Sequence, residues 1–323
     1  MSIYPFEIAC VKSVKNTRAT ACNFDPKNIE MGIFLPKGTV LTHSQLQAIK
    51  ATLLAKAKED DKALRIYPVK RFVDVEDKST EATYKEYANG TKKKVRDGKY
   101  GWKWTYTEGG LSLHTKLHSF DGQQDAFDFA LVDTKNNGLI MTSTDGMTAK
   151  GFDLSIIDVN NFKMAGFSDP SEYYIEVGLD NSDELNRNPI FVPFPDNFDP
   201  LNDLNGLYDL EISVHTAMDN TGLVALKLTT GNRAVDMYDD YSAVFDDTLL
   251  YSVTNAATGG AIAVTSLTPT PGTKTFDLQL DALDPNFPAT AGSLIKIYIG
   301  DASDIEAEGA PGYSEAEIVT PRG

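Results

Sequence analysis

The stretch Gly109–Phe152, GGLSLHTKLHSFDGQQDAFDFALVDTKNNGLIMTSTDGMTAKGF, carries more apolar periodicity and turn signals than any other part of the chain. Its first part, residues 111–118, alternates apolar and polar side chains, which predicts a strand with one buried face. Farther along, the spacing of apolar residues lengthens and predicts a short helix over about 122–132.

Turn residues divide the second half of this stretch. Asn136-Asn137-Gly138 interrupts the chain, and Asp145-Gly146 stands between two further apolar runs, as the turn of a hairpin does. The predicted order is therefore strand, helix and return hairpin. We expect the apolar side of the strand to lie beneath the helix; that side consists of Leu111, Leu113 and Leu117.

Two histidines, His114 and His118, have the H-x-x-x-H spacing of half a metal site. On a strand they face the same side about 13 Å apart, because each residue advances the chain by about 3.3 Å. One metal ion cannot bridge that distance. We therefore expect no metal site at this pair, which is interpreted as part of a sheet face.

The 323 residues suit two domains of ordinary size, and the formal net charge of −16 is unevenly distributed. Residues 1–168 carry 24 Lys and Arg against 20 Asp and Glu, whereas residues 169–323 carry 6 against 26. The acidic second half argues against a surface that grips nucleic acid there, because it would repel phosphates.

Neither a run of eighteen apolar residues nor the pattern of a secretory signal occurs in the sequence, so we expect no membrane partner and synthesis in a cytoplasm. Cys10 and Cys22 are the two cysteines. They could form one disulfide, but without a secretory signal such an isolated pair is expected to stay as free, buried thiols.

The clearest predicted helix spans about residues 42–58. Thr42 and Gln45 have the spacing of a capping box, in which two side chains satisfy amides at a helix start. Leu46, Ile49 and Leu53 then repeat at helical spacing, so this helix is expected to cover another layer with one apolar stripe.

A polar, lysine-rich stretch at about 76–103, with a turn signal at Asn89-Gly90, predicts a long two-stranded arm. One interpretation is a solvated hairpin whose lysines prevent edge-to-edge aggregation. The other is contact with an acidic neighbouring subunit. The basic candidates for that contact are Lys85, Lys92, Lys93, Lys94, Arg96 and Lys99.

Trp102 and Trp104 alternate with Lys103 directly after the arm, which places both rings on one face of a strand. Such a face is most often packed in a sheet or against another subunit, so both tryptophans are also candidates for inter-subunit contact. A sugar-binding platform is the alternative interpretation.

Prolines and Asn/Asp residues crowd residues 191–205, which are predicted to be a linker between an N-terminal domain, residues 1–190, and a C-terminal one, residues 206–323. Seven short alternating runs in the C-terminal part predict an immunoglobulin-like or fibronectin-type sandwich. These runs cover residues 208–215, 224–228, 249–253, 261–267, 276–280, 295–299 and 316–319.

The sequence lacks the HExxH, GxSxG, P-loop and GxGxxG motifs, so we expect no catalytic residues, no cofactor and no enzyme. An EF-hand loop counted back from Gly206 places Leu201 and Ile212 at ligand positions, and neither can bind calcium. A calcium site without that motif stays open at the acidic stretches 180–183, 199–206 and 236–247.

In its order of elements, residues 1–190 resemble the tail tube (major tail) proteins of tailed bacteriophages. The resemblance rests on LSLHTKLHSF as strand, DGQQDAFDFALVD as helix and GLIMTSTDGMTAKGFDL as hairpin, preceded by the arm. Residues 206–323 resemble the immunoglobulin-like domains that decorate such tubes and phage heads. The expected fold is mainly β: a tail-tube-like β-sandwich or barrel with one or two packed helices, followed by the second sandwich.

The resemblance implies a structural virion protein, made in the bacterial cytoplasm, that assembles into stacked hexameric rings. Its partners would be itself, neighbouring tail proteins and DNA that passes through the lumen without specific binding. The helix at 42–58 and the long N-terminal segment depart from the family pattern, so a neck, tail-terminator or head-decoration role is an alternative. A monomeric carbohydrate-binding module using Trp102 and Trp104 is another.

Overall fold

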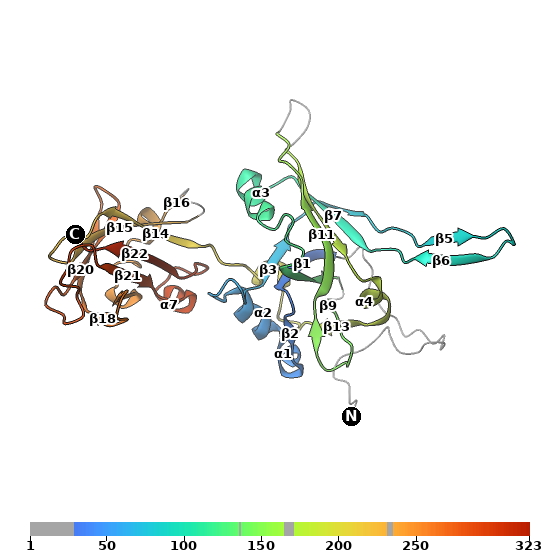
Figure 1. Ribbon diagram of the computed structural model, residues 1–323, viewed down its shortest axis with the longest axis horizontal. Coiled ribbons are helices and arrows are strands. Elements are labelled where there is room, and N and C mark those ends of the chain that lie inside the picture. The colour runs from blue at the N-terminus through green and yellow to red at the C-terminus, as the bar shows by residue number, and fades with distance from the viewer. Residues whose placement is uncertain (1–28, 136, 165–170, 231–234) are drawn as a thin grey trace. The chain divides into compact units, whose positions relative to one another are not determined.

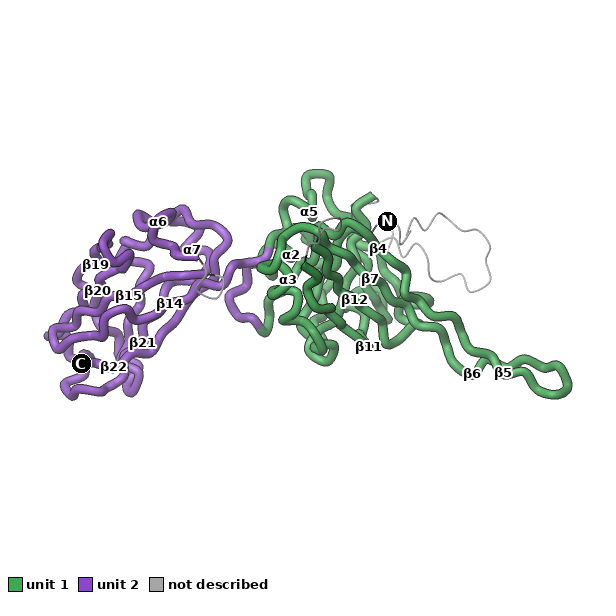
Figure 2. The backbone as a smooth tube through the Cα atoms, turned by 90° about the horizontal axis from the view of Figure 1, so that it is seen from above, with its two compact units in different colours: residues 1–57, 63–205 green, residues 58–62, 206–323 purple. Residues whose placement is uncertain are grey.

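The computed structural model describes residues 29–135, 137–164, 171–230 and 235–323, which form a mainly β protein (Figure 1). The chain divides into two compact units (Figure 2). Unit 1 contains residues 1–57 and 63–205, and unit 2 contains residues 58–62 and 206–323. The two cysteines, and with them the expectation of free thiols, lie outside the described residues.

Unit 1 is built on one eleven-stranded antiparallel sheet with a two-stranded hairpin beside it. The strands of the large sheet are β1 (Ile29–Pro36), β2 (Val40–Leu41), β3 (Tyr67–Lys70), β4 (Asp74–Asp77), β7 (Gly101–Tyr106), β8 (Phe127–Asp133), β9 (Gly138–Thr142), β10 (Ala149–Lys150), β11 (Phe152–Val159), β12 (Tyr173–Leu179) and β13 (Pro189–Pro193).

Strand β11 makes this sheet fold over on itself. Its first residues pair with β8, with Phe152 opposite Phe129, and from Leu154 onward it pairs with β12, with an irregularity between Leu154 and Ile156. The two halves enclose an aromatic core. That core includes Phe34, Trp102, Trp104, Tyr106, Phe129, Phe152, Tyr173, Ile175 and Val177.

The edge strands β3 and β4 follow one another in the chain, but no ladder joins them among the described strands. The expected barrel is therefore not formed within the single chain. What the fold does provide is a bent sheet with a packed interior.

A second core, the aliphatic core, lies on the other side of β1 and β8. These strands contribute alternate residues to the two cores: Met31 and Val132 to the aliphatic core, Phe34 and Phe129 to the aromatic core. The predicted helix at 42–58 covers the aliphatic core as α1 (His43–Gln47) and α2 (Ile49–Ala57), broken at Ala48. The predicted capping box is present, with the Thr42 amide donating to Gln45 Oε1 at 2.8 Å.

Residues 109–152 do not follow the predicted order of strand, helix and hairpin. Residues Gly110–His118 form helix α3, not a strand, and Phe127–Asp133 form strand β8, not a helix. Gly109 and Gly110 have φ of 81° and 55°, a left-handed region that glycine adopts readily, and they turn the chain from β7 into α3. On the helix Leu111 is exposed, whereas Leu117 reaches the aromatic core.

The predicted linker is also wrong, because residues 191–205 belong to unit 1 and place several side chains in its aliphatic core. Strand β13 pairs with β9 in register, and α5 (Pro200–Asp203) follows it. Phe194, Phe198 and Leu204 are buried in the aliphatic core. The Lys70 ammonium fixes the end of the segment by donating to Leu201 O, Leu204 O and Asn205 Oδ1 at 2.6–2.9 Å.

A half-buried ion-pair network joins the start of β8, the end of β10 and the start of β11. Lys37 Nζ lies 2.9 Å from both Asp128 and Asp153, and Lys150 Nζ lies 3.2 Å from Asp153 and 2.9 Å from Glu184 on helix α4 (Ser182–Arg187). Burial opposes ionisation of Asp153, but hydrogen bonds from Lys37 and Lys150 outweigh it and lower the pKa of Asp153 to about 2.

This network predicts acid sensitivity of unit 1. A carboxyl with a folded pKa below its unfolded value of about 3.9 contributes stability above that value and loses it as the pH falls toward 2. Because a third of the Asp153 side chain is exposed, screening reduces the effect to about 1–2 kcal/mol. We expect Asp153→Asn to lower the free energy of unfolding at pH 7 by that amount and to flatten its decline between pH 4 and 2 in urea titrations.

The matched control is Asp125→Asn, which changes an exposed carboxyl of the same unit. It is expected to leave the free energy of unfolding within about 0.5 kcal/mol of the wild-type value. Equal acid sensitivity of wild type and Asp153→Asn would contradict the role given to this network.

Each of the seven predicted runs contributes at least one strand to the antiparallel sheets of unit 2. One five-stranded sheet has the order β14-β15-β20-β19, with β16 beside β15, and a four-stranded sheet has the order β18-β17-β21-β22. The strands are β14 (Leu210–Thr216), β15 (Leu223–Thr230), β16 (Val235–Asp236), β17 (Tyr251–Asn255), β18 (Ala261–Ile262), β19 (Val264–Thr270), β20 (Thr275–Leu280), β21 (Leu294–Ile299) and β22 (Ala316–Pro321).

One apolar core lies between the two sheets of unit 2. Leu226 and Leu278 come from the first sheet, and Val253 and Ile297 come from the second. Short helices α6 (Tyr238–Tyr241), η2 (Thr248–Leu250) and α7 (Ala302–Ala307) lie in the connections. Inward residues alternate with outward ones, which is the pattern the sequence predicted for a sandwich.

Candidate functional site: the β5–β6 arm

The predicted arm exists and is the most exposed regular element of unit 1. Strands β5 (Thr83–Glu86) and β6 (Lys92–Arg96) form a sheet of two strands, which projects from the body of the unit (Figure 1). All nine of these strand residues are exposed. Gly90, with φ of 77°, makes the turn at the predicted Asn89-Gly90 position.

The register of the hairpin sorts its charges onto two faces. Tyr84 lies opposite Lys94, and Glu86 lies opposite Lys92, whose Nζ is 3.4 Å from Glu86 Oε2. On the other face Lys85 lies directly opposite Lys93, a like-charged pair that destabilises an isolated hairpin. Residues 83–96 contain five basic side chains and one acidic one, a net charge of +4 within a protein of −16.

The arm also exposes apolar and aromatic side chains that the sequence pattern did not reveal. Tyr84, Tyr87 and Val95 are 60%, 45% and 64% exposed. Lys85 Nζ lies 5.6 Å from the centre of the Tyr87 ring, two residues along the chain. Tyr84 lies opposite Lys94 of the lysine run, a closeness that arises only once the strands pair.

The base of the arm is held firmly in the large sheet. Lys78 and Thr80 donate their amides to Gly101 O and Lys99 O, and the candidate Lys99 pairs with Asp180 at 2.9 Å. Arg96 stands at the end of β6, opposite Thr83. A fixed base and a tip without buried side chains make this hairpin suited to contact something outside its own unit, because two strands alone are marginally stable in water.

The two candidate tryptophans do not join this surface. Trp102 and Trp104 are 2% and 0% exposed and point into the aromatic core, where Trp104 stacks on Phe72 at 4.9 Å. Their strand neighbour Lys103 points outward and pairs with Glu76. This face is therefore packed, and the packing is internal to unit 1. Because neither ring is exposed, these tryptophans do not form a sugar-binding platform.

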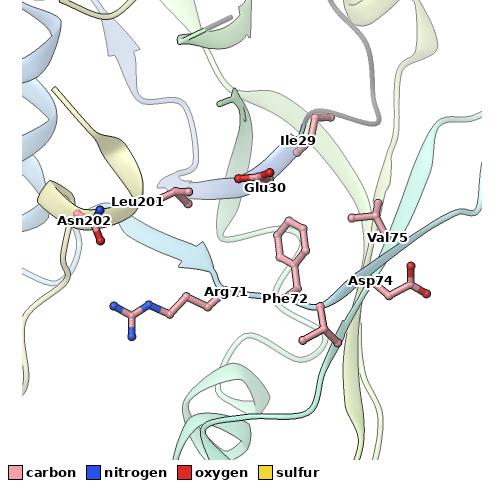
Figure 3. Close-up of a pocket in the computed structure, with 9 residues that line it drawn as sticks. Ile29, Glu30, Arg71, Phe72, Asp74, Val75, Leu201 and Asn202 are labelled. Carbon is pink, nitrogen blue, oxygen red and sulfur yellow. The ribbon is translucent and has the colours of Figure 1, made fainter. Parts of the chain in front are cut away.

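An open pocket lies where β1 begins, between β1, the connection from β3 to β4, and α5 (Figure 3). Arg71 stands there with φ of 66°, and Phe72 points from the same connection toward Glu30 (Figure 3). The carboxylates of Glu30 and Asp74 lie on different sides of this ring in the same view. The pocket thus offers no pair of groups aimed at one reacting atom.

His114 and His118 lie on helix α3. The distance of about 13 Å between them, which was expected for two residues on one strand, is therefore wrong. Their ring centroids are 5.7 Å apart. His114 is buried and shares a hydrogen bond of 2.8 Å with Asn160 O, while His118 is half exposed. Among the described residues, no group of three or more His, Cys, Asp or Glu side chains is placed to hold a metal ion.

Neither a protein-family model nor any characterised protein matches this chain in sequence. In the described parts of the chain, no helix combines the length and the apolarity needed to cross a lipid bilayer.

Proposed function

We propose that this chain is a structural virion protein of a tailed bacteriophage, which assembles as stacked hexameric rings of the tail tube through which DNA passes. The observation that carries the proposal is the β5–β6 arm. It is basic, fully exposed and without a core of its own, so it gains stable packing by meeting another subunit. The folded-over sheet of unit 1 gives it a rigid base.

Charge complementarity favours another copy of the same chain as the partner of the arm. Residues 83–96 have a net charge of +4, so the other residues together have a net charge of −20. An acidic subunit surface attracts the arm, whereas DNA in the lumen is repelled by acidic walls and slides without specific binding.

Unit 2 is proposed to be an immunoglobulin-like domain on the outside of the tube. Its sheet orders, β14-β15-β20-β19 and β18-β17-β21-β22, match the ABED and C′CFG arrangement of that sandwich when the strands are lettered in chain order. The net charge of residues 206–323, with 5 Lys and Arg against 17 Asp and Glu, suits a solvated outer surface.

Electron microscopy of the purified protein tests the proposal. Negative staining and sedimentation over a range of concentrations are expected to show rings or tubes that dissociate as the salt concentration rises, because exposed charges are screened. If the protein stays monomeric at high concentration, the proposal of a tail tube is wrong.

A double variant tests the arm itself. Lys85→Glu with Lys93→Glu keeps a like-charged pair across the hairpin while reversing its sign, so the hairpin itself changes little. We expect the concentration needed for assembly to rise by tenfold or more, that is by about 1.4 kcal/mol or more per contact. The matched control, Lys135→Glu with Lys163→Glu, changes two exposed lysines elsewhere in unit 1 and is expected to assemble normally.

A further inference from the structure

Helix α3 carries His114 and His118 four residues apart, and both rings lie on one side of the helix with their centroids 5.7 Å apart. We propose that these two imidazoles bind one divalent transition-metal ion, such as Zn²⁺, Cu²⁺ or Ni²⁺. Two histidines at this spacing on a helix are a recurrent way to hold such an ion. The site is independent of the proposed tail-tube role.

His114 is already oriented as a metal ligand. Its Nε2 lies 2.8 Å from the carbonyl oxygen of Asn160, an acceptor, so the proton of the neutral ring resides on Nε2 and Nδ1 carries the free lone pair. Metal-binding histidines typically donate their other N–H to a carbonyl in this way. The rings of Phe162 and Tyr173, with centroids 5.6 and 5.4 Å away, hold the imidazole in place.

The Nδ1 atom of His114 is the ring nitrogen left over for a metal ion. Among the described residues it has no hydrogen-bond partner, because the bond to Asn160 O is made by Nε2. A lone pair that is unpaired and held in a fixed orientation is what an incoming ion requires.

His118 supplies the second ligand from a more exposed position. Its side chain is 51% exposed, and its Nδ1 lies 3.7 Å from Asp121 Oδ2. Asp121 is itself fixed, because its Oδ1 accepts the amide of Val159 at 3.0 Å. The carboxylate thus stands where it can orient the His118 ring, as carboxylates do beside metal-bound imidazoles.

The separation of the rings fits a shared ion. A metal about 2.1 Å from one nitrogen of each ring lies about 3.2 Å from each ring centroid, so centroids 5.7 Å apart correspond to an angle of about 125° at the metal. That is close enough to tetrahedral for a small rotation of the exposed His118 ring to complete the geometry.

The donor set decides which ions suit the site. Imidazole nitrogen favours Zn²⁺, Cu²⁺ and Ni²⁺ over Ca²⁺ and Mg²⁺, which prefer oxygen. With two protein ligands and water in the other positions, affinity is expected in the micromolar range, about 10–100 μM, well below that of closed structural zinc sites. Binding would join successive turns of α3 and stabilise its C-terminal end.

Calorimetric titration with zinc chloride tests the site in the full-length protein. All samples carry Cys10→Ser and Cys22→Ser, so that thiolates do not compete for the ion. The proteins compared are this background, His118→Ala, and His215→Ala, which removes an exposed histidine of unit 2 as a control. We expect one ion per chain, at least tenfold weaker binding for His118→Ala, and unchanged binding for His215→Ala.

Electron paramagnetic resonance of the Cu²⁺ complex identifies the ligands. The spectrum is expected to show coordination by two imidazole nitrogens, reduced to one in His118→Ala. The metal-free thermal midpoint of His118→Ala reports its folding, and His118→Gln, which keeps the bulk of the side chain, serves as a second variant. Undiminished zinc binding by either variant, or no binding by the background protein at about 1 mM zinc, overturns the proposal.

Discussion

Replacing Trp104 by alanine is expected to destabilise unit 1 by about 3–5 kcal/mol, the usual cost of removing a large buried aromatic ring. The ring is 0% exposed and lies 4.9 Å from Phe72 and 5.4 Å from Phe129, centroid to centroid. Its neighbourhood is so full that a Cβ added to Gly32 would come within 2.6 Å of the indole. The surroundings therefore cannot collapse easily into the space left behind.

Urea unfolding of the full chain, followed by circular dichroism, measures this loss. Trp104→Phe is the matched control, because it keeps an aromatic ring and removes the indole N–H, which is buried without a hydrogen-bond partner among the described residues. We expect it to cost less than half as much as alanine. A cost below about 1 kcal/mol for Trp104→Ala would mean that the ring is free to serve another partner.

Replacing Asp60 by alanine is expected to destabilise unit 2 by about 2–4 kcal/mol. Asp60 belongs to the short segment 58–62 that joins unit 2, although it lies far from the rest of that unit in sequence. Its carboxylate accepts the amide of Ala302, at 3.2 and 3.1 Å to the two oxygens, and the amide of Glu315 at 3.1 Å. Alanine would leave both amides without this acceptor.

Hydrogen exchange of the Ala302 and Glu315 amides, together with urea unfolding, measures the effect on unit 2. Both amides are expected to exchange faster in the variant. Asp246→Ala, which changes an exposed carboxylate of the same unit, is the control and is expected to stay within about 0.5 kcal/mol of the wild type. Unchanged exchange at both amides contradicts the role assigned to Asp60.

Elements with a strong local signal were predicted correctly from the sequence. The arm with its turn at Asn89-Gly90 and the strands of unit 2 occur as expected, and the capped helix at 42–58 occurs in two pieces divided at Ala48. Each depends on neighbours in sequence: a capping box, a turn dipeptide, or alternation on a sheet with one buried face.

The elements within residues 109–152 were predicted wrongly because they depend on packing against other parts of the chain. Strand β8 lies between two cores and is buried on both faces, so its apolar residues do not alternate and were taken for a helix. Residues 111–118 alternate by coincidence, since Leu113 and Leu117 also share one face of α3. Tertiary packing, and not local sequence preference, therefore determines the secondary structure of both β8 and α3.

The candidate site was predicted in part. The basic residues of the arm were found, but its exposed Tyr84 and Tyr87 were not. The closeness of Tyr84 to Lys94 depends on strand pairing, which residue spacing does not show. The predicted linker at 191–205 failed because proline and asparagine were taken as signs of a mobile segment. Phe194, Phe198 and Leu204 secure that segment in the core instead.

The assignment of residues 58–62 to unit 2 has a consequence for the order of folding during synthesis. Asp60 leaves the ribosome 242 residues before Ala302 and 255 before Glu315. These contacts therefore form near the end of translation, after the rest of the first two hundred residues has had time to fold. Because contacts of long sequence separation form slowly, the last step in maturing this chain is expected to be the capture of an early segment by a late domain.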